Sequence, residues 1–240
     1  MSIDRSKEQE ILNIIRAAPA FPQSRACALR ICNSSIAEPL GLYKLITMDP
    51  VLYFQTRALF HEYFPPKKGE YSSIAKIIII LNINTVKNHI LPFVERAPVK
   101  KDGETGLVFL HSIACAVAAR AIAGLCGVCR ADYEPHYAAA LLDNIGKYVR
   151  VKGVSGGALA PFIAKTAGLD TKREDLLNTT ALASYIVHSG LPSKYGGDKN
   201  VRLPERAAKK LGADEELLSK AARQTRAEIK KCEAFIKAGA

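Results

Sequence analysis

The chain has 240 residues, of which 48% are hydrophobic and 24% are charged, and its formal net charge is +11 at pH 7. This hydrophobic content is enough for a sizeable core and argues against a largely disordered chain. The basic balance suits nucleic acid, acidic lipid or an acidic protein as a partner, although short lysine pairs without a long basic arm are more typical of a solvated surface.

The N-terminal segment is polar and charged, unlike a secretory signal peptide, so we expect a protein made and retained in the cytoplasm. The apolar run Ile77–Leu81 is too short to cross a bilayer, and we expect no membrane span. The six cysteines are then expected to be reduced thiols.

The first third of the chain predicts helices. Apolar residues at helical spacing follow residue 10, and Pro19 and Pro22 end this pattern. Asp49-Pro50 is a strong helix start, because aspartate accepts hydrogen bonds from free backbone N–H groups and proline suits the first helical position. We expect the helix that follows to end at Pro65-Pro66.

The run Lys76–Asn84 allows two interpretations. Its consecutive isoleucines favour a strand by propensity, whereas a short buried helix after Ser72-Ser73 fits the pattern equally well. Asn84 is the expected cap of the next helix.

The charged, glycine-bearing segment Lys100–Gly106 indicates an internal boundary. An alanine-rich helix is expected over about 107–125, and another from about Glu134-Pro135. Cys126 and Cys129 form a lone CxxC with His136 nearby, but a structural zinc ion normally needs four ligands and the fourth is unclear.

Capping patterns mark the last helices. Thr171 and Glu174 have the spacing of a capping box before a helix that reaches His188. Asp214 is expected to cap the final helix, whose early acids and late lysines suit the helix dipole.

Several segments carry a family resemblance. Pro22–Leu59 combines a proline-marked start with a helix that ends in an acidic-Pro dipeptide, and Leu182–Pro192 and Pro204–Lys220 resemble later segments of the same family. Phe109–Ala123, followed by Ala139–Lys147, is similar to the HD-superfamily pattern of a histidine in an alanine-rich helix and then a helix ending in LLHDIGK. From residue 11 onward the chain therefore resembles the HDOD family, the HD-related output domains.

This resemblance implies an all-α fold: a multi-helical HD-like bundle with an additional N-terminal helical subdomain. The HDOD domain would cover residues 11–205, with the N-terminal helical part over about 11–99 and the HD-like part over about 105–205. Residues 206–240 would form a C-terminal helical extension packed on the domain.

The resemblance also identifies a remnant of a metal site. Active HD phosphohydrolases hold divalent metal with histidines and aspartates, and the metal activates water. The central His-Asp pair reads Asp143-Asn144 here, and asparagine is a poor ligand for a hard cation. The first histidine is matched by His111, whereas the late histidine position holds Asn178, ten residues before His188.

We therefore expect a remnant pocket without metal or other cofactor, able to bind a small anionic ligand and lined by His111, Asp143, Asn144, Lys147 and Asn178. A purely structural interpretation is also open. In it, His111 is a buried histidine that bonds to a backbone carbonyl, and Asp143-Asn144 only ends a helix.

Three functions follow from these observations. The favoured one is a non-catalytic bacterial signal-transduction module that acts by binding a protein partner or a small ligand. The first alternative is a metal-dependent phosphohydrolase of nucleotides or cyclic dinucleotides, with an unorthodox site of Asp143, His111 and His136. The second is a regulator that binds nucleic acid through its basic C-terminal region.

Overall fold

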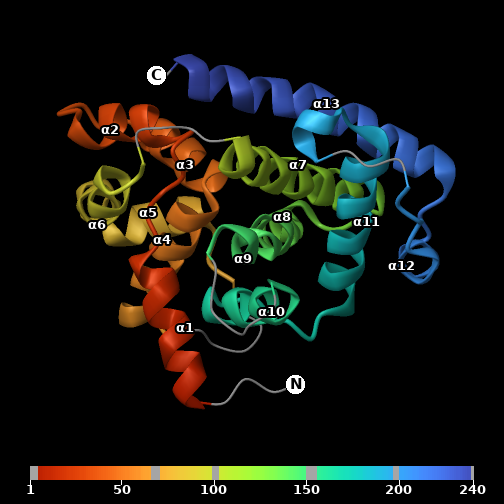
Figure 1. Cartoon of the computed structure of the whole chain (residues 1–240), viewed down its shortest axis with the longest axis horizontal. Coiled ribbons are helices and arrows are strands. Elements are labelled where there is room, and N and C mark those ends of the chain that lie inside the picture. The colour runs from red at the N-terminus through yellow and green to blue at the C-terminus, as the bar shows by residue number, and fades with distance from the viewer. Residues whose placement is uncertain (1–4, 66–70, 99–102, 150–155, 197–199, 239–240) are drawn as a thin grey trace.

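The computed structural model describes residues 5–65, 71–98, 103–149, 156–196 and 200–238, and every regular element in these ranges is helical (Figure 1). The predicted all-α fold is confirmed. The α-helices are α1 (Arg5–Ala17), α2 (Arg25–Asn33), α3 (Pro39–Met48), α4 (Pro50–Tyr63), α5 (Ile74–Leu81), α6 (Ile83–Glu95), α7 (Gly103–Leu125), α8 (Tyr133–Asp143), α9 (Ile145–Tyr148), α10 (Gly156–Thr166), α11 (Glu174–Gly190), α12 (Glu205–Leu211) and α13 (Glu215–Ala238). Two short 3₁₀ helices, η1 (Arg130–Asp132) and η2 (Ser193–Tyr195), lie between them.

Helix α7 organises the molecule. It packs against α8, α11 and α13, and Figure 1 shows it between the group α2–α6 on one side and α11 with α12 on the other. Helix α13 lies along the outer edge over α7. One apolar core joins α1–α6 to α7, α8 and α10, and a second joins α7 and α8 to α11, α12 and α13. The expected division of the chain near residue 100 is therefore crossed by a continuous core.

Small side chains let α7 pack closely on several neighbours. Its length and apolar composition would suffice to cross a membrane, contrary to the expectation based on the short apolar run Ile77–Leu81. Within the protein, however, 67% of its most apolar window is buried, as in the core helix of a globular domain. The bent pair α5 and α6 passes the same test only if the two helices count as one span, and they meet at 110°.

The Asp49 carboxylate fixes the start of α4. Its Oδ1 accepts hydrogen bonds from the backbone N–H groups of Val51 (2.9 Å) and Leu52 (3.1 Å), as the Asp-Pro pair predicts. Its Oδ2 accepts from the Phe21 N–H (2.9 Å) and the Ser24 hydroxyl (2.5 Å), which belong to the proline-marked segment before α2. One buried side chain thus caps a helix and anchors a distant loop.

The isoleucine run is a helix, which resolves the ambiguity between strand and helix. The Ser73 hydroxyl accepts from the Lys76 N–H at 3.2 Å and caps α5. Ile74, Ile77 and Ile78 are buried at helical spacing, while Ile79 is 80% exposed. A buried strand would instead alternate its faces residue by residue.

Two predicted caps are wrong. Asn82, in the left-handed region at φ 70°, caps α6 by accepting from the Asn84 N–H at 3.0 Å, so the cap lies two residues before the predicted one. The Thr171–Glu174 box does not form, because the residue at the N-cap of α11 is Arg173. Asp214 caps α13 as predicted, through the Leu217 N–H at 2.8 Å.

The expected boundary at Lys100–Gly106 lies partly outside the described residues. From Gly103 onward this segment already belongs to α7, so the helix starts earlier than the predicted residue 107.

Replacing Asp49 by alanine should destabilise the fold strongly, because it leaves several buried donors without an acceptor. We expect a loss of about 3 kcal/mol in the free energy of unfolding, measured with urea. Asp214→Ala, which removes an exposed cap, is the matched control and should cost about 1 kcal/mol. Equal losses in the two variants would contradict the anchoring role of Asp49.

Candidate functional site

His111 is a buried residue of α7 that is tied to a distant backbone segment. Its Nδ1 lies 2.8 Å from the carbonyl oxygen of Tyr195 at the end of η2. Because a carbonyl oxygen only accepts, Nδ1 carries the hydrogen. In the neutral ring Nε2 is then an acceptor, and the Cys115 thiol, one helical turn later, donates to it at 3.5 Å.

His188 on α11 makes the same kind of bond one residue further along. Its Nδ1 donates to the carbonyl oxygen of Gly196 at 2.6 Å, and its ring centroid lies 4.9 Å from that of His111. Helices α7 and α11 thus approach the segment after η2 with paired imidazoles. We call His111, Cys115, His188, Tyr195 and Gly196 the histidine cluster.

Gly196 is required by this geometry. Its φ of 85° lies in the left-handed region, and a Cβ there would lie 2.9 Å from Nδ1 of His111. Both the backbone conformation and the close approach of the imidazole therefore favour glycine at this position.

The predicted site residues differ in exposure and in position along the helices. Asn144 is 4% exposed in the turn between α8 and α9, whereas the neighbouring Asp143 is exposed. The side chain of Lys147 lies outside the described residues. Asn178 is half-buried on α11, ten residues before His188, which is about 15 Å along the helix axis. The histidine beside His111 is His188, which was not among the predicted site residues.

His136 on α8 belongs to a different group of residues. It is fully buried, with Nδ1 3.2 Å from the Thr179 hydroxyl and Nε2 3.5 Å from Oδ2 of Asp175 on α11. The Asp175 carboxylate is also bound by Arg173, which lowers the pKa of Asp175. The contacts of His136 are to α11 rather than to Cys126 or Cys129, so they do not support the CxxC zinc site.

The residues present do not fit the metal centre of an HD phosphohydrolase. Among the residues that the structure describes, no three His, Cys, Asp or Glu side chains are close enough to share a metal ion. Such centres need at least three protein ligands. His111 and His188 instead turn their Nδ1–H groups to carbonyls, and Asn144 occupies the buried position with a neutral amide.

The helical fold, with His111 on its central helix and Asp143-Asn144 at the end of α8, agrees with a comparison against known protein families. A family model described as the HDOD domain matches residues 18–160, more than half of the chain. The chain belongs to the HDOD family. No curated protein and no solved structure matches it significantly.

The HDOD match ends within α10, so α11, α12 and α13 lie beyond it. Three of the five residues of the histidine cluster, His188, Tyr195 and Gly196, come from this later part. The likeness of the late segments to the family therefore stays a prediction.

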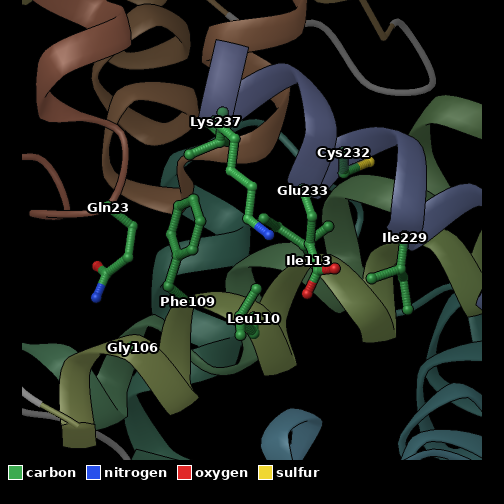
Figure 2. A pocket seen from close by; sticks show the side chains of 10 residues that line it. Gln23, Gly106, Phe109, Leu110, Ile113, Ile229, Cys232, Glu233 and Lys237 are labelled. Carbon is green, nitrogen blue, oxygen red and sulfur yellow. The ribbon is translucent and has the colours of Figure 1, made fainter. Parts of the chain in front are cut away.

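An apolar pocket of about 180 Å³ opens between α7 and α13 of the HDOD chain (Figure 2). Its apolar walls are formed by side chains of both helices, chiefly Phe109, Leu110, Ile113, Ile229, Cys232 and Ile236. Burial raises the pKa of the Cys232 thiol to about 11, so this side chain is neutral at physiological pH. None of the four predicted site residues whose side chains the structure describes lines this pocket.

A charged pair connects this pocket to the histidine cluster. Glu233 lines the pocket, and its Oε1 accepts hydrogen bonds from Lys194 Nζ (2.7 Å) and from the Tyr195 hydroxyl (3.0 Å). Tyr195 is the residue whose carbonyl binds His111. The short helix η2 therefore touches α7 through its backbone and α13 through its side chains.

Replacing Gly196 by alanine should cost more stability than the same change at Gly212. Both glycines are left-handed, but a Cβ on Gly212 meets nothing within 4 Å. We expect Gly212→Ala to cost roughly 1 kcal/mol, from the backbone conformation alone. Gly196→Ala should cost roughly twice that and shift the NMR signals of the His111 ring. Equal costs with unchanged His111 signals would contradict the close approach.

Acid should destabilise the protein through its buried histidines. Burial lowers the pKa of His136, and also those of His61 and His89, below the usual 6.5. The unfolded chain then takes up protons first, so stability is complete above pH 6.5 and falls as the pH drops below it. His136→Gln should reduce the slope of the free energy of unfolding between pH 7.5 and 5.5. An unchanged slope would contradict this assignment.

Proposed function

We propose that this HDOD chain is a non-catalytic regulatory module of a bacterial, cytoplasmic signalling pathway, and that it acts by binding a protein partner. The observation that carries this proposal is the hydrogen bonding of its two paired histidines to the protein backbone. The Nδ1–H groups of His111 and His188 donate to the backbone carbonyls of Tyr195 and Gly196 in the connecting segment after α11.

The loss of acidic ligands supports the same conclusion. A catalytic metal in an HD-type site activates water and offsets phosphoryl charge, which needs anionic ligands to retain the cation. Asn144 contributes no charge, and among the described residues no alternative set of three ligand side chains is present. The interaction surfaces of the chain, rather than a reaction centre, then become the basis of its function.

The phosphohydrolase alternative is less well supported, because its three residues do not come together. His136 binds Thr179 and faces Asp175, whereas His111 lies in the histidine cluster with His188.

Metal analysis and a hydrolysis assay test the non-catalytic proposal. The purified chain is incubated with Mn²⁺ or Fe²⁺, desalted, and analysed by mass spectrometry for bound metal. It is then assayed with bis(p-nitrophenyl) phosphate and with a cyclic dinucleotide. We expect far less than one metal ion per chain, and no turnover above a metal-only control.

His111→Ala and His188→Ala serve as matched variants in these assays. Stoichiometric metal that disappears in either variant, together with turnover of a phosphodiester, would overturn the proposal. If both variants and the parent chain show the same trace of metal, the metal is adventitious and the proposal stands.

A further inference from the structure

The outer side of α13 carries a row of cations that leads into the apolar pocket. Arg223, Arg226, Lys230 and Lys237 are all exposed, and their spacings of three, four and seven residues place them on one side of the helix. We call these four residues the basic stripe. Lys237 also lines the pocket, so the stripe ends at the pocket itself.

The one acidic residue within this row is already neutralised. Glu233 lies between Lys230 and Lys237 and is bound by Lys194 and the Tyr195 hydroxyl. The Arg226 guanidinium is held over the end of α11 by its Nε, which donates to the Gly190 carbonyl at 3.1 Å. The stripe therefore keeps a net positive charge and contains one positioned guanidinium.

Pocket and stripe differ in chemistry but adjoin each other. Figure 2 shows the side chains of Lys237 and Glu233 reaching from α13 toward Phe109 and Ile113 of α7. A dry apolar cavity of about 150 Å³ accepts a benzene ring. The pocket, at about 180 Å³, is therefore large enough for a phenyl group or a branched aliphatic side chain.

The dimensions of the stripe indicate a polymer rather than a small molecule. Residues 223 and 237 are 14 positions apart, or about 21 Å along the helix axis. An extended peptide covers this distance with about six residues. An occupant of the pocket alone would leave most of the stripe without a partner.

Two other anionic partners, nucleic acid and a membrane surface, fit this surface less well. A nucleobase in the pocket would lose the hydration of its polar edge against almost wholly apolar walls. A membrane-surface helix inserts its apolar face into the bilayer, whereas the apolar face of α13 is already packed on α7.

We infer that the pocket and the basic stripe together form a docking groove for an extended acidic segment of a partner protein, which inserts one aromatic or large aliphatic side chain into the pocket. This inference rests on the proposed role of the chain as a partner-binding module. The apolar anchor supplies a buried contact, and the acidic residues set orientation and association rate.

Fluorescence anisotropy with labelled heptapeptides tests the groove. The probes contain six Asp or Glu residues and one Phe, placed at either end because the direction of the chain in the groove is not specified. Matched probes replace Phe by Ser, or all acids by Lys. We expect the full-length chain to bind at least one Phe probe in about 0.15 M salt, with the Ser probe about tenfold weaker and the Lys probe unbound.

Substitutions in the chain test the basic stripe and the pocket separately. Lys230→Glu with Lys237→Glu should weaken the acidic probe at least about tenfold. The matched control, Lys76→Glu with Lys209→Glu, makes the same charge change at exposed positions on α5 and α12, away from the stripe, and should alter binding less than about twofold.

Gly106→Leu fills the pocket from α7, where the new Cβ meets only the flexible Gln23 amide at 3.2 Å. This variant should abolish the preference for Phe over Ser while keeping the helix, which a thermal melt checks.

Several results would overturn the groove. They are absence of binding to either Phe probe up to 1 mM, equal affinity for the Phe and Ser probes, and equal losses in the stripe and control variants. Tighter binding of a 20-base-pair DNA duplex or of phosphatidylserine vesicles through the stripe would also overturn it. Each of these results is independent of the metal and hydrolysis assays, so failure of the groove is distinguishable from failure of the non-catalytic proposal.

Discussion

Two imidazole-to-carbonyl hydrogen bonds hold the second half of this molecule together. Through them α7 and α11 fix the backbone at Tyr195 and Gly196. The side chains of the same short helix bind Glu233 and so place the C-terminal part of α13 over α7. The pocket lies between α13 and α7, so its shape depends on these contacts together with the apolar packing of α13 on α7.

Local patterns in the sequence predicted the helices well where a few neighbouring residues determine the result. The Asp49-Pro50 start of α4 and the Asp214 cap of α13 are confirmed because each depends on donors within three residues. The true cap of α6, Asn82, depends on a left-handed residue at a sharp bend between two packed helices. Spacing along the chain contains no signal for that bend.

The site was harder to predict than the fold, because proximity in it comes from packing. The family resemblance places Asn178 at the position of a metal ligand. It gives no role to His188, which lies ten residues later. In the structure α11 runs beside α7, and the chain after it returns through η2 toward both histidines. A signal was nevertheless present in the sequence: a late helix ending in His188-Ser-Gly, followed by Tyr195-Gly196, supplies a histidine and a glycine that can accept its close approach.

On the non-catalytic function proposed above, loss of the metal and loss of the buried acid are physically coupled. A carboxylate buried at the end of α8 without a cation would carry a large desolvation cost, which a metal ion normally offsets. Without a bound cation, a neutral amide has a smaller desolvation cost than a carboxylate at that position. Asn144, which is 4% exposed, is such an amide. The neighbouring acid, Asp143, is exposed at the same turn. On that proposal, a helical fold of this kind survives the loss of a reaction centre without an electrostatic penalty, and its surfaces are free to acquire a binding role.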